Sequence, residues 1–111
     1  MSQLQDTLQQ IKDPTVAEAK AQFEQLITDG KASSQAFIQS SAEQLEQWVL
    51  DVAQGKMGQD EFEELVASQS IVAKNFVLSQ SLATQKRAEE LTIKALKLAA
   101  KEIVPLLIAA V

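Results

Sequence analysis

The sequence contains no cysteine, no histidine and no tyrosine, and these absences exclude much of the chemistry that enzymes use. Without cysteine there is no disulfide and no thiolate nucleophile. Without histidine there is no His-dependent catalytic triad and no usual zinc or haem ligation. No glycine-rich phosphate-binding loop is present either. We therefore expect a protein that is not an enzyme, with no catalytic residues, no cofactor and no metal site.

A single carboxylate cluster, "DEFEE" at residues 60–64, could attract a hard cation. Asp60 and Glu64 are four residues apart, so they share one face of a helix. Acidic residues in the first turn of a helix are already favoured by the helix dipole. The expected role of this cluster is therefore to stabilise a helix N-terminus, without a metal.

Glycine and proline are scarce, at three and two residues, whereas Ala, Gln, Glu, Leu and Lys are abundant. This composition favours helices, and the residues typical of strands never cluster in alternation. With 111 residues, of which 46% are hydrophobic, the chain is long enough to form one domain with a buried core. We predict a single all-α domain over residues 1–111.

No apolar run is long enough to cross a membrane: the longest, Ile103 to Val111, has nine residues where about twenty are needed. The N-terminus has no basic region followed by an apolar stretch, so we expect no secretory signal and a cytoplasmic location. The net charge of −5 argues against binding nucleic acid through its phosphate backbone.

Two helices are predicted in the N-terminal half. A short one covers residues 3–12 and stops before Pro14, because a residue that precedes proline is disfavoured in the α conformation. The second is expected to run from 15 to 54 without a break. Its apolar stripe keeps the same helical phase on both sides of Gly30, which favours continuity and places this glycine on the buried face.

A tight turn is predicted next, with Gly55 ending one helix and Gly58 starting another. The third helix is expected to cover residues 59–104. Pro105 should end or kink it, because proline lacks a backbone donor and clashes with the preceding turn. The apolar tail then occupies residues 105–111.

These lengths predict a long antiparallel helical hairpin preceded by a short N-terminal helix. The third helix carries two apolar stripes, and its hairpin partner can cover only one of them. A second copy of the chain would cover the other, which predicts a homodimeric four-helix bundle. The alternative is a compact monomer, in which bends near Gly30 and Ser81 fold the chain into four short helices and the tail becomes core.

The second stripe and the tail are the predicted contact surface, both for a second copy and for another protein that the sequence does not identify. The expected function is therefore non-enzymatic helical self-assembly and protein interaction. The residues of this predicted contact surface are Ile71, Leu78, Leu82, Ile93, Leu96, Ile103, Leu106 and Leu107.

Five basic residues share one side of the C-terminal segment, and they form a possible basic ridge: Lys86, Arg87, Lys94, Lys97 and Lys101. Three interpretations are open. The ridge is a solvated face, or it docks against Glu18, Glu24 and Asp29 of the same or a second chain. In the third, it lies on an anionic membrane surface with the apolar tail inserted, which makes peripheral membrane binding the alternative function.

Overall fold

The structure, a computed structural model, describes residues 3–110, and every regular element within them is helical. The all-α prediction is confirmed. A 3₁₀ turn at Pro14–Val16 precedes the second helix. The last helix is continuous over residues 82–110 and is called here the C-terminal helix. It comprises α5 (Leu82–Glu89), α6 (Ala95–Leu98) and α7 (Val104–Ala110), joined by two π-helical turns, Glu90–Lys94 and Ala99–Ile103. The other helices are α1 (Gln3–Leu8), α2 (Ala17–Lys31), α3 (Ala36–Ala53) and α4 (Gln59–Leu78).

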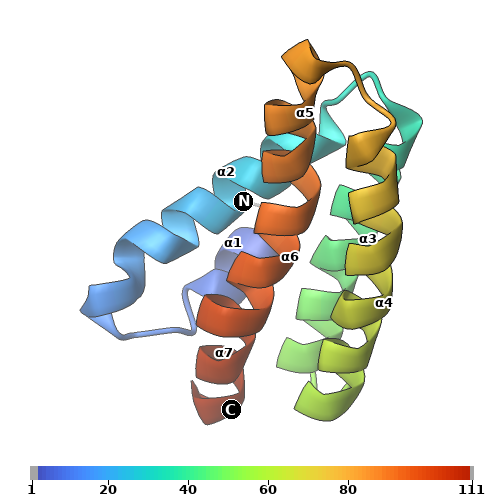
Figure 1. Cartoon of the computed structure of the whole chain (residues 1–111). Coiled ribbons are helices and arrows are strands. Elements are labelled where there is room, and N and C mark those ends of the chain that lie inside the picture. Colours follow the sequence, from blue (N-terminus) through green and yellow to red (C-terminus); the bar gives the residue numbers. More distant parts are fainter. Residues whose placement is uncertain (1–2, 111) are drawn as a thin grey trace.

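The C-terminal helix lies in the middle of the molecule, with α2 on one side and the antiparallel pair α3 and α4 on the other (Figure 1). The described residues extend over 41 × 25 × 22 Å. Uninterrupted helices over 15–54 and 59–104 would be about 60 to 69 Å long at 1.5 Å per residue. The long hairpin is therefore not the fold of the chain. The structure has the compact arrangement, with bends close to Gly30 and Ser81 and with five helices.

The predicted continuity of residues 15–54 is wrong, because α2 ends at Lys31 and α3 begins at Ala36. Gln35 adopts an extended conformation, and its backbone amide donates to the Ser33 hydroxyl at 3.1 Å. Such a local side-chain acceptor stabilises a turn in competition with the helix. Buried residues of α2 and of α3 belong to one core, so a shared apolar phase does not require one continuous helix.

The predicted continuity of residues 59–104 is also wrong, since α4 ends at Leu78 and α5 starts at Leu82. Polar side chains bond the backbone carbonyls around this break. The Ser79 hydroxyl donates to the backbone carbonyl of Phe76 at 2.6 Å, and the side-chain amide of Gln85 donates to the backbone carbonyl of Gln80 at 3.1 Å. These hydrogen bonds compensate for helical bonds that the break removes.

The turn between α3 and α4 matches its prediction in detail. Gly55 has a φ of +76°, the left-handed conformation that glycine adopts without strain. Its amide donates to the Val52 carbonyl, and the Lys56 amide donates to the Asp51 carbonyl at 2.8 Å, which together form a Schellman motif. Gly58 is the N-cap residue of α4.

Pro105 neither ends nor sharply interrupts the C-terminal helix, contrary to the prediction. The turn before it, Ala99–Ile103, is a wider π-helical turn, and the Val104 amide bonds the Ala99 carbonyl five residues back. Such a turn changes the register of the backbone bonds near a residue that cannot donate one. The helix consequently continues to Ala110.

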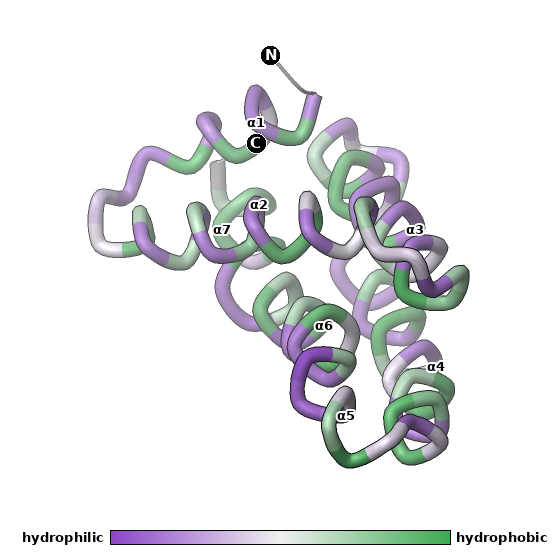
Figure 2. The backbone as a smooth tube through the Cα atoms, turned by 90° about the horizontal axis from the view of Figure 1, so that it is seen from above, coloured by the Kyte–Doolittle hydropathy of each residue, from purple (hydrophilic) through white to green (hydrophobic). Residues whose placement is uncertain are grey.

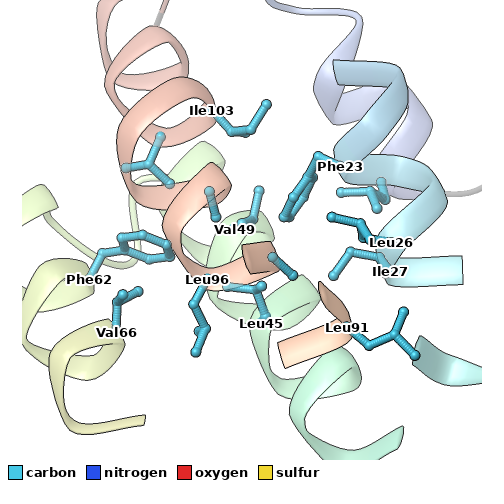
Figure 3. Close-up of a cluster of buried hydrophobic side chains, with 14 of the residues drawn as sticks. Phe23, Leu26, Ile27, Leu45, Val49, Phe62, Val66, Leu91, Leu96 and Ile103 are labelled. Atoms are coloured by element: carbon cyan, nitrogen blue, oxygen red, sulfur yellow. The ribbon is translucent and has the colours of Figure 1, made fainter. Parts of the chain in front are cut away.

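The apolar C-terminal segment contributes to the core, because Ile103, Val104 and the tail residue Leu107 are fully buried, although Ile108 is 38% exposed. Large side chains from α2, α3, α4 and the C-terminal helix meet around it (Figure 3). The hydropathy colouring in Figure 2 shows further hydrophobic residues where α4 meets α5, at an outer corner of the molecule. The cluster labelled in Figure 3 contains Phe23, Leu26, Ile27, Leu45, Val49, Phe62, Val66, Leu91, Leu96 and Ile103.

Candidate interaction surface

Four large apolar side chains are exposed along α4 and at the start of α5, and we call them the apolar patch. They are Ile71, Val72, Leu78 and Leu82, with exposed fractions of 67%, 49%, 65% and 89%. Ile71 and Leu78 are two helical turns apart on one face of α4, and Leu82 follows after a three-residue break. Single exposed hydrophobic residues are common, but a cluster of this kind is a sign of a contact surface.

The apolar patch faces outward because α4 presents its other side to the core. Phe62, Val66, Ala73 and Val77 are buried, and this inner stripe packs against α3 and the C-terminal helix. At about 100° per residue, Ile71 and Leu78 lie on the opposite side of the helix from Phe62. The rings of Phe76 and Phe37 stack at 4.4 Å between centroids, which holds the C-terminal end of α4 against α3.

The predicted contact surface is divided by the fold. Its first three members, Ile71, Leu78 and Leu82, are exposed and belong to the apolar patch. Leu96, Ile103 and Leu107 are fully buried, and Ile93 and Leu106 are partly buried against the core. These residues are buried because the bend at residues 32–35 brings α2 onto the face of the C-terminal helix that a second copy was expected to cover.

Val72 was missed as a surface residue, because periodicity assigns it to the inner stripe of α4 with Val66 and Ala73. In the structure it is about half exposed, at the edge of that stripe. The sequence carries one signal for this position: Val72 directly follows Ile71, and two neighbouring residues on a helix point about 100° apart.

The basic ridge lies at the surface, with Lys86, Lys94, Lys97 and Lys101 all exposed. Arg87 differs from them, because its guanidinium donates to the Asp29 carboxylate of α2 at 2.7 Å and contacts Glu90 at 3.5 Å. The predicted docking of the ridge onto acidic residues of the same chain thus holds for this one residue.

The ion pair between α5 and α2 changes the titration of both partners. The hydrogen bond from Arg87, with a second one from Gln25, lowers the pKa of the Asp29 carboxyl. The same carboxylate raises the pKa of Arg87. The hollow beside the ridge is lined by two lysines and two glutamates together with Leu82 and Gln85, so its charges balance.

Two kinds of functional geometry are absent from the residues that the structure describes. No group of three or more carboxylates in residues 3–109 is arranged to hold a metal ion. None of the helices within 3–110 is long and apolar enough to cross a membrane.

Comparisons with known proteins return no relative. No protein-family model, no curated protein and no solved structure matches the chain.

Proposed function

We propose that this chain is a non-enzymatic helical module that acts by binding another protein chain through the apolar patch. The observation that supports the proposal is the exposure of Ile71, Leu78 and Leu82, each about two-thirds exposed or more. Among residues 3–109 the next most exposed large apolar side chains are Val72 and Ile108, at 49% and 38%. Full burial of a leucine or isoleucine side chain is worth about 1.5–3 kcal/mol. A partner that covers these side chains would gain that free energy.

The lipid-surface alternative has less support. Binding an anionic bilayer through the basic ridge with the tail inserted requires tail side chains that are free to insert. Leu107 is fully buried, and so is Val104 just before the tail, whereas Ile108 is 38% exposed. Insertion of Leu107 would open the core. We therefore expect no binding to vesicles that contain phosphatidylserine, measured by co-sedimentation at low ionic strength. Binding that weakens as salt is added would contradict this expectation.

Site-specific photo-crosslinking in the cells that make this protein tests the proposal. A photoreactive amino acid replaces Ile71 in the full chain, and the matched control carries it in place of Glu43, an exposed residue of α3. Irradiation should give a discrete protein adduct from position 71 and none from position 43. Equal labelling at both positions, or no protein adduct from position 71, would overturn the proposal.

A further inference from the structure

The outward face of α4 carries charged and apolar side chains together. Its residues follow one another at alternating intervals of four and three, which places them along one face of the helix. All six are exposed, and we call them the outer seam: Asp60, Glu64, Ala67, Ile71, Lys74 and Leu78. α4 lies at the edge of the molecule, so this seam has no covering helix among residues 3–110 (Figure 1).

Charge along α4 and into α5 is strongly polarised. Residues 60–64 contain four acidic side chains, all exposed, and no basic one. From residue 65 to residue 88 there is no acidic side chain, whereas Lys74, Lys86 and Arg87 are basic. The apolar patch lies within the second of these segments. A partner helix should therefore be acidic opposite Lys74 and basic opposite Glu64.

We infer that this partner is a second copy of the chain, with the two α4 helices antiparallel about a twofold axis. The inference rests on the proposed function, since it names the partner of the same surface. In an antiparallel pair centred near residue 69, the outer seam matches itself: Glu64 faces Lys74 of the other copy, and Ala67 faces Ile71. The twofold axis makes each of these contacts twice.

The remaining seam contact brings Asp60 to Leu78 at each end of the pair. This contact is at the rim, where the carboxylate stays hydrated and Leu82 lies just beyond the end of α4. A parallel pair would instead bring the acidic ends of both helices together, which is repulsive. An anionic lipid surface would be repelled by the same acidic end. Antiparallel self-pairing brings the opposite charges of Glu64 and Lys74 together at both symmetric contacts and leaves Asp60 and Leu78 at the rim.

Charge reversal in the full chain tests the pairing. Glu64→Lys alone and Lys74→Glu alone should each weaken self-association by about tenfold or more, because like charges then face each other at both symmetric contacts. An equimolar mixture of the two variants should form a heterodimer, since position 64 of each variant then meets the opposite charge at position 74 of the other. Sedimentation velocity measures the self-association of each variant alone and the heterodimer in the mixture, where one of the two variants carries a label.

The controls are Glu43→Lys and Lys97→Glu, two exposed charge reversals on other helices, which should dimerise like the unaltered chain. Circular dichroism shows that each variant is folded. An unaltered chain that stays monomeric up to about 1 mM overturns the inference. So does a dimer whose affinity is unchanged in both seam variants, or a mixture that does not recover the association.

These failures are distinguishable from failure of the proposed function. If the chain does not self-associate but position 71 crosslinks to a protein of another mass, the surface still binds protein and only the identity of the partner is wrong. If position 71 gives no protein adduct and no dimer forms, both proposals fail.

Discussion

At Gly30 the backbone of α2 passes so close to α3 that a methyl group added there would lie 2.7 Å from the Ala42 Cβ. The neighbour is a methyl group attached directly to the backbone, so it cannot rotate away. Gly30 costs α2 about 1 kcal/mol in helix propensity, and the close approach is what the glycine permits. Its place on the buried face was predictable from the phase of the apolar stripe.

Gly30→Ala should therefore destabilise the protein, although alanine is the better helix former. Overpacking costs about 1–3 kcal/mol, which outweighs the gain in propensity, and we expect a net loss of about 1 kcal/mol in the free energy of unfolding. Urea denaturation followed by circular dichroism measures the change.

The matched control is the same substitution in an Ala42→Gly background, where the opposing methyl group is absent. There Gly30→Ala should become stabilising, because only the propensity term remains. Destabilisation of equal size in both backgrounds would show that the contact with Ala42 is not the cause.

Thr92 is the most deeply buried of three buried polar residues within 3–109, with a side chain only 1% exposed. Thr92 lies within the π-helical turn Glu90–Lys94, and its hydroxyl donates to the carbonyl of Ala88, two residues before that turn, at 2.7 Å. Thr92→Val keeps the shape and removes the donor. We expect a loss of about 0.5–1.5 kcal/mol in the free energy of unfolding, measured by urea denaturation. A variant as stable as the parent would show that the hydroxyl is not needed there.

At the scale of the elements, the ion pair between Arg87 and Asp29 connects α5 to α2 across 58 residues of sequence. Because the pKa of Asp29 is lowered in the folded state, the pair stabilises the fold above the ordinary carboxyl value of 3.8. That stability is lost as the pH falls through the lowered pKa.

Asp29→Asn should reduce the free energy of unfolding by at most about 1 kcal/mol at pH 7, since both partners are partly exposed. The difference from the parent should shrink below pH 3.8 and in high salt. Denaturation at a series of pH values measures it. A deficit that stays constant into strong acid would mean that the carboxylate charge is not responsible.

Some features of the helices and turns could be predicted from the sequence, and others could not. The helical class and the turn at Gly55 and Gly58 were predictable, because each depends on local propensity and on the conformational freedom of glycine. The bends after Lys31 and Leu78 were predicted only as the alternative to two continuous helices. They depend on short polar side chains that hydrogen-bond the backbone, and on core contacts that form only after the chain has folded back on itself.

The candidate interaction surface could likewise be predicted from the sequence only in part. The second apolar stripe was recognised, and its members Ile71 and Leu78 are exposed. Periodicity could not separate them from Leu96 and Ile103, because it shows that a helix face is apolar and not which element covers it. The bend that places α2 against the C-terminal helix decides this, and it is a tertiary event.

At the scale of the whole molecule, the fold separates residues that stabilise the monomer from residues that are free to bind. Leu96→Ala should cost about 2–5 kcal/mol of unfolding free energy, because it leaves a cavity in the centre of the core. Leu82→Ala should change stability by no more than about 0.5 kcal/mol, because that side chain is 89% exposed. Thermal unfolding of a dilute sample compares the two. Similar losses would mean that Leu82 is covered within the monomer.

The central claim is that the outward face of α4 pairs with a second copy of the chain. Light scattering after size exclusion, over a concentration series of the unaltered chain and of Ile71→Glu, tests it most directly. We predict that the unaltered chain approaches twice its mass of 12.1 kDa as concentration rises, while Ile71→Glu stays folded at 12.1 kDa. A mass of 12.1 kDa for both chains at every concentration, or a dimer that Ile71→Glu leaves intact, would contradict the claim.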